Sequence, residues 1–136
     1  MEASAHEGRR RRPSRPGAAV LGAVAGIAVT VTAVAVLWWP RADVVQESRA
    51  PADVEYADGS RHHLALVEER TLSGRETYRL VVGRDPGHGY GHHVDLGSGV
   101  AAEGIESAEW TAAGVRVQFG TGHRVFVPAS LFVGGR

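Results

Sequence analysis

Residues 115–127 read VRVQFGTGHRVFV, and this stretch decides the fold. Val115, Val117 and Phe119 alternate with polar residues, which is the period of a β-strand that buries one face. The following GTG supplies a turn, and the two valines of HRVFV share one face of a second strand before Pro128 ends it. The stretch therefore predicts an antiparallel hairpin.

The same pattern occurs earlier, where residues 54–64 read VEYADGSRHHL. A valine, a polar residue and an aromatic residue precede two turn residues, a glycine and an apolar strand, in the same order as in VQFGTGHRVFV. Asp-Gly between two β-rich runs is the strongest short-range hairpin signal. A hairpin with strands at 54–57 and 61–67 is therefore expected.

Further short runs of β-forming residues are separated by glycine-rich turns and show no sustained helical period. The complete set of expected strands covers residues 54–57, 61–67, 77–82, 93–96, 105–110, 115–119 and 123–127. The prediction is a mainly β protein in which one N-terminal transmembrane α-helix precedes a small antiparallel β-barrel or sandwich. An open sheet with the segment PASLF, at 128–132, as a short helical turn against it is the alternative.

The transmembrane helix is predicted from residues 18–39, which contain no charged side chain. Twenty-two helical residues reach about 33 Å, enough for a hydrocarbon core of about 30 Å. A cleaved signal peptide is the rival interpretation, but the run is long for one and no small-residue cleavage site follows it. Trp38 and Trp39 suit a membrane interface, and Pro40 ends the helix.

Arginine is concentrated before the span, with five residues in 1–17, and this asymmetry predicts a cytoplasmic N-terminus. The expected organisation is a cytoplasmic Arg-rich tail at 1–17, the span at 18–39, a linker at 40–53 and an extracytoplasmic β domain at 54–136. The protein is thus expected in the cell membrane as a single-pass protein, with an envelope protein as its partner.

Small residues recur every four positions on one face of the predicted span, at Ala18, Gly22, Gly26 and Thr30. Small residues let two helix backbones approach closely in lipid, and the face resembles the glycophorin-type dimerisation motif. This pattern predicts a homodimer through the span. Ala and Gly are common throughout the run, so a chance spacing is the alternative.

Composition excludes several function classes. The chain has no Cys and no Lys, so it offers no thiolate nucleophile and no Cys-based zinc site. Residues 40–136 carry ten Arg and thirteen acidic residues, a balance that argues against nucleic acid as a partner. Ser98 lies in LGSGV and lacks the glycines of a nucleophile elbow. The sequence therefore predicts a non-enzymatic protein without a cofactor.

The one stretch rich in chemical groups is GRDPGHGYGHHVDLG, at 83–97. A solvated hairpin loop is one interpretation, with Asp-Pro-Gly as an ordinary turn. A recognition surface is the second, with contacts from Tyr90, His88 and His92. A metal site is the third, and it would combine His93 and Asp95 with His88 from the loop or His123 from another strand, because alternation on a strand separates His92 from His93.

The segments GRDPGHGYG, at 83–91, and HRVFVPASLFVGG, at 123–135, are the most specific parts of a wider resemblance. With its Arg-rich tail and single span, the chain resembles a group of small single-pass membrane proteins from high-GC actinobacteria. The resemblance covers most of the chain. It implies topology and host type, and it carries no activity and no site residues.

Overall fold

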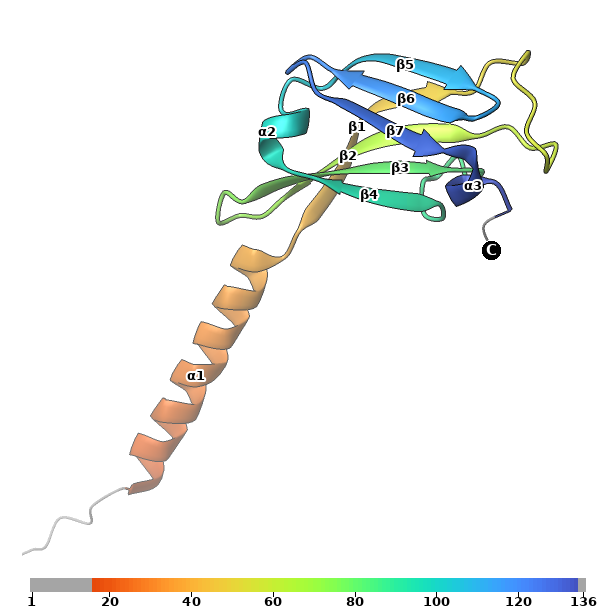
Figure 1. Ribbon diagram of the computed structural model, residues 1–136. Helices are drawn as coiled ribbons and strands as arrows, with labels where there is room; N and C mark the ends of the chain where they lie inside the picture. Colours follow the sequence, from red (N-terminus) through yellow and green to blue (C-terminus); the bar gives the residue numbers. More distant parts are fainter. Residues whose placement is uncertain (1–15, 135–136) are drawn as a thin grey trace, which may run out of the picture. The chain divides into compact units, whose positions relative to one another are not determined.

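The protein is described by a computed structural model for residues 16–134, and its chain divides into two compact units, Met1–Val36 and Leu37–Arg136. Helix α1 (Pro16–Trp38) accounts for all the described residues of the first unit (Figure 1). It has 23 residues without a charge, so by length and composition it is a candidate membrane span. The Arg-rich tail before Pro16 lies outside the described residues.

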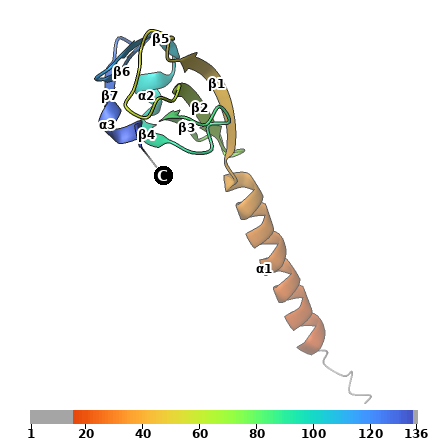
Figure 2. The same cartoon turned by 90° about the vertical axis from the view of Figure 1, so that its right-hand side faces the viewer.

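The second unit consists of two antiparallel sheets, and Figures 1 and 2 show one lying over the other. The first sheet has the order β1-β2-β3-β4, with β1 (Arg41–Arg49), β2 (His63–Arg70), β3 (Glu76–Gly83) and β4 (His92–Leu96). The second has the order β5-β6-β7, with β5 (Ile105–Thr111), β6 (Gly114–Phe119) and β7 (Arg124–Pro128). Two short helices, α2 (Ser98–Ala101) and α3 (Ala129–Phe132), follow β4 and β7. The predicted mainly β fold is confirmed as a sandwich, not a closed barrel.

The core lies between the sheets and is built from alternate residues of their central strands. Leu64 pairs with Val82 and Leu66 with Leu80, so these four side chains lie on one face of the first sheet. They are fully buried, as are the opposing side chains of β6, Val115, Val117 and Phe119. The predicted hairpin at 115–127 is confirmed by the register of β6 and β7.

The predicted hairpin at 54–67 is wrong in its first half. Residues 54–57 form no strand, because Tyr56 turns into the core with a ring 6% exposed, and its hydroxyl donates to the carbonyl of Thr111 at 3.0 Å. Asp58 and Gly59 do form a turn, in which Gly59 has φ +62° and its N–H donates to the Tyr56 carbonyl. The turn leads into β2, but residues 54–57 before it do not pair with β2.

The partner of β2 is β1, formed by residues expected as a linker. Arg41 pairs with Arg70 and Arg49 with His63, with a bulge at Val45 between Val44 and Gln46. Because β1 is an edge strand with most side chains exposed on both faces, it needs no alternation of polar and apolar residues. Its sequence therefore lacks the signal that reveals a half-buried strand.

One side of the sandwich is fastened by the side chain of Gln46. Its Nε2 donates to the carbonyl of Ile105 at 3.1 Å, and its Oε1 accepts the N–H of the same residue. Both strands have a bulge here. The side-chain amide of Gln46 supplies the donor and the acceptor that the backbone of a neighbouring strand would otherwise provide. Trp110 Nε1 adds a hydrogen bond to Ser48 Oγ at 3.1 Å. These contacts join β1 to β5, the edge strands of the two sheets.

Candidate functional site

The loop between β3 and β4, residues 84–91, is organised by one carboxylate. Asp85 accepts the N–H of Gly87 and of Gly89, each at 2.9 Å, and its own carbonyl accepts the N–H of His88. These backbone donors stabilise the charged form and lower the pKa of Asp85 below its ordinary value. The Asp-Pro-Gly segment is therefore the start of a loop with a defined backbone.

Two glycines hold the ends of this loop together. A Cβ on Gly83 would lie 2.5 Å from the carbonyl oxygen of Tyr90, and a Cβ on Gly91 would lie 2.6 Å from the carbonyl oxygen of Val82. Both distances are shorter than any real contact of a side chain, so the two backbones approach closely only because both residues are glycine. The close approach fixes the backbone positions of Tyr90 and His92, which flank Gly91.

A groove of about 620 Å³ opens beside this loop. Its lining comes from the loop and the adjoining ends of β3 and β4, from α3 and from the segment before β2. It consists of Ser60, Gly83, Arg84, Asp85, Tyr90, Gly91, His92, Leu131 and Phe132. Tyr90 is 78% exposed and Leu131 50% exposed, so two large apolar side chains face solvent here. We refer to this feature as the Tyr90 groove.

The structure brings together two of the three predicted contact residues. Tyr90 and His92 both line the groove, whereas the side chain of His88 is 5% exposed and lies with Nδ1 3.8 Å from Glu47 Oε1. A φ of +57° turns His88 back, and its ring packs edge-on to His63 at 6.4 Å between centroids. Burial lowers the pKa of His63, and Arg49 and His88 lower it further. His88 therefore anchors the loop to the outer face of the first sheet.

The four residues of the predicted metal alternative are not assembled into one site. Asp95 forms an ion pair with Arg79 at 2.8 Å, and His123 lies in the turn between β6 and β7, where it contacts Thr121 Oγ1. His93 pairs with Val81 across β3 and β4. Within residues 16–134 no group of three His, Asp or Glu side chains is placed to hold a metal ion. The metal-binding alternative is not favoured.

Leu131 and Phe132 line the groove but were not among the predicted contact residues. Phe132 is 3% exposed and packs against a buried aromatic cluster, with ring centroids 5.4 Å from Tyr56 and 5.0 Å from His62. His62 is fully buried, and its Nε2 lies 3.4 Å from Asp58 Oδ2. The expected helical turn at PASLF was the only sequence signal for these two residues. It did not indicate which parts of the sandwich α3 would contact.

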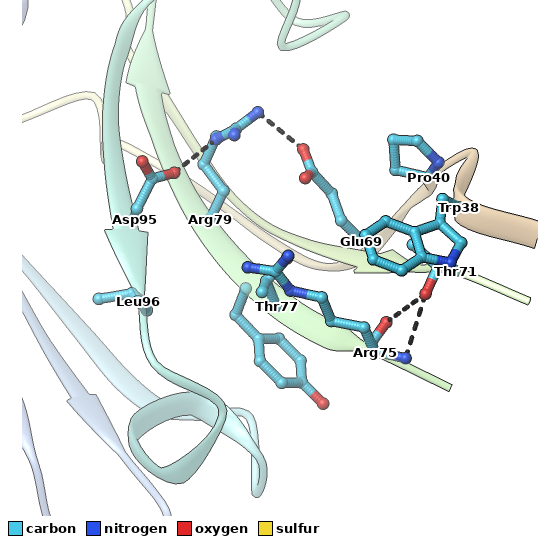
Figure 3. A pocket seen from close by; sticks show the side chains of 10 residues that line it. Trp38, Pro40, Glu69, Thr71, Arg75, Thr77, Arg79, Asp95 and Leu96 are labelled. Atoms are coloured by element: carbon cyan, nitrogen blue, oxygen red, sulfur yellow. Dashed lines mark hydrogen bonds and ion pairs between the residues drawn. The ribbon is translucent and has the colours of Figure 1, made fainter. Parts of the chain in front are cut away.

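A second hollow of about 420 Å³ lies at the other end of the first sheet, and Figure 3 shows side chains that line it. Arg79 bridges Glu69 and Asp95 there, with nitrogen–oxygen distances of 2.7 and 2.8 Å. Trp38 and Pro40 also line the hollow. On β4 the lining residues of the two hollows, His92 and Asp95, are three residues apart, about 10 Å along the strand.

Comparisons with protein-family models, with curated proteins and with solved structures find no match to this chain. The resemblance to small actinobacterial membrane proteins stays a prediction. The Tyr90 groove offers an exposed phenol, an exposed leucine, an imidazole and a carboxylate whose oxygens accept backbone N–H groups.

Proposed function

We propose that the protein is a single-pass membrane protein that holds a recognition domain outside the cytoplasm and acts by binding, not by catalysis. Its partner in this proposal is a protein or another component of the cell envelope. Helix α1 supplies the anchor, because it is apolar and long enough to cross a bilayer. The excess of Arg before α1 supports a cytoplasmic N-terminus.

The observation that carries the binding proposal is the pair of exposed apolar side chains in the Tyr90 groove. Tyrosine gives a large contact area at a small cost in conformational entropy, which suits it to recognition. Its backbone is held by the Asp85 carboxylate and by the two close glycines at the loop ends, so the ring is presented from an ordered framework. A partner segment with an apolar side chain would fill the groove between Tyr90 and Leu131.

Polar groups at the groove edge would orient such a segment. His92 can donate or accept a hydrogen bond, and the peptide groups of the loop add further donors and acceptors. The small-residue face of α1, with Gly22, Gly26 and Thr30, adds a homodimer to the proposal, which would place two grooves on one assembly. Two linked grooves would bind a repetitive envelope surface more tightly than one.

Site-specific photocrosslinking in intact cells tests the proposal. A benzophenone amino acid at position 90 is expected to form an adduct with one partner, and the same group at position 126 is expected to form none. Phe126 is a matched control, because it is an aromatic residue 48% exposed on β7, away from the groove. The adduct at 90 should be lost in the Leu131→Asp variant. Equal adducts at both positions would contradict the proposal.

A further inference from the structure

The turn between β2 and β3 lies next to the point where the chain leaves α1. Only Trp39 and Pro40 separate the end of α1 from β1, a reach of about 7 Å. Arg41 at the start of β1 pairs with Arg70 at the end of β2, so the turn that follows Arg70 is held near the same point. The N–H of Ser73 donates to the carbonyl of Leu37 at 3.1 Å. If α1 crosses a membrane, this turn is kept within a few ångströms of the bilayer surface.

The turn presents a leucine outward. Thr71 Oγ1 accepts the N–H of Arg75 at 3.1 Å, and the Thr71 N–H donates to the Arg75 carbonyl, so the ends of the turn are tied together. Leu72 at its tip is 53% exposed. Trp38 and Trp39 are 67% and 71% exposed. Apolar side chains grouped on a surface mark an interaction site, and indole rings favour the membrane interface.

Two arginines on this end have cationic groups available for a ligand. Within residues 16–134, Arg41 and Arg75 form no ion pair, whereas Arg70 is held by Glu68 and Glu76. Arg75 and Trp38 both line the second hollow, which Figure 3 shows in close-up. A guanidinium binds phosphate through two parallel N–H donors, so a phosphate ester is the ligand that matches Arg75.

We propose that the β2–β3 turn is a second membrane contact, in which Leu72 enters the interface of a phospholipid bilayer and Arg75 binds a headgroup phosphate. This inference rests on the proposed membrane anchor, and it holds for either orientation of α1. The contact would limit the motion of the sandwich about residues 39–40. The Tyr90 groove, at the opposite end of strands β2 and β3, would then face away from the bilayer.

The absence of cysteine from the chain allows a direct test with single-cysteine variants of the full-length protein in lipid nanodiscs. A fluorophore is attached in the variants Leu72→Cys, Leu131→Cys and Val29→Cys, and lipids carrying a quencher at the headgroup or deep in the acyl chain are added. Leu131 is the matched control, since it is 50% exposed against 53% for Leu72 but lies in the Tyr90 groove. Position 29 reports insertion of α1 itself.

The label at 72 is expected to be quenched by headgroup-quencher lipid several-fold more strongly than the label at 131. Arg75→Gln should reduce that quenching in discs containing phosphatidylglycerol, and Arg75→Lys should retain part of it. Equal quenching at 72 and 131, with deep quenching at 29, would overturn the second contact and leave the anchor intact. No quenching at 29 would overturn both. A further outcome is a label at 72 that is protected from solvent in native membranes but not contacted by lipid in nanodiscs. That result would mean that a protein covers the turn, and it would also overturn the inference.

Discussion

Replacing Phe132 with alanine tests whether α3 is docked by its aromatic contacts. The ring is 3% exposed and packs edge-on against Tyr56 and His62, with Trp110 6.4 Å away between centroids. Removing a buried phenylalanine ring costs about 3–5 kcal/mol, since transfer free energy is lost and a cavity remains. Against a total of about 5–15 kcal/mol for a domain, this loss would leave the sandwich marginally stable. Binding through the Tyr90 groove should weaken as well, because Leu131 precedes the lost anchor.

The matched control is Phe126→Ala. Phe126 is 48% exposed on β7, and its ring is 6.0 Å from the guanidinium carbon of Arg116. An exposed cation–π contact contributes about 0.5–1 kcal/mol, so this loss should be several-fold smaller. Urea unfolding of the full-length protein in mild detergent, followed by circular dichroism, measures both, because α1 stays helical in the micelle. Similar losses for the two variants would refute the argument that α3 is held by burial of its phenylalanine.

Three further predictions concern the loop and the span. The charged form of Asp85 accepts the hydrogen bonds that order the loop, and these bonds lower its pKa below the ordinary value of 3.8. The loop should therefore be fully ordered above pH 3.8 and lose its order only as the pH falls through the lowered pKa. The amide proton shifts of the two glycines it binds will report this in NMR spectra, and Asp85→Ala should give the disordered shifts at every pH. Gly83→Ala should lower the free energy of unfolding, measured with urea, by about 1–3 kcal/mol, because the new Cβ would clash with the backbone of the loop. Gly97→Ala is the control. It should change the free energy of unfolding by no more than about 0.5 kcal/mol, since nothing lies within 4 Å of its Cβ position. Gly26→Ile should lower self-association of the span in membranes measured by energy transfer, and Ala28→Ile, on the other side of the helix, should leave it unchanged; equal behaviour of the two would end the dimer proposal.

Sequence patterns predicted the strands that supply the core. In β6, Val115, Val117 and Phe119 alternate with polar residues because each second residue enters the core, whereas β2 and β3 have continuous buried runs, Leu64–Leu66 and Leu80–Val82, and were predicted from their β-forming residues. The pattern failed for β1, whose two faces are both mostly exposed, and for residues 54–57, where Tyr56 is buried without a strand. Whether these positions are buried depends on contacts with segments distant in sequence. The local alternation of polar and apolar residues carries no information about such contacts.

The candidate site was predicted to a similar degree. Tyr90 and His92 are close because they flank one glycine, so proximity in sequence was enough. Leu131 reaches the same groove from α3, which follows the last strand of the second sheet, and only the packing of distant segments brings it there. His88 was expected beside Tyr90, but its positive φ reverses the chain and directs the ring toward Glu47. No pattern of residue types identifies such a backbone conformation in a non-glycine residue.

The pairing of β1 with β2 also has a mechanical consequence. A partner held in the Tyr90 groove and an anchor fixed at Arg41 would pull on opposite ends of the first sheet. Tension would then run along β1, whose eight register pairs with β2 lie perpendicular to that direction. Hydrogen bonds loaded in this way share a shear force instead of opening one after another. If α1 is the proposed membrane anchor and the groove holds the proposed partner, the pairing of β1 with β2 is the geometry that resists extension.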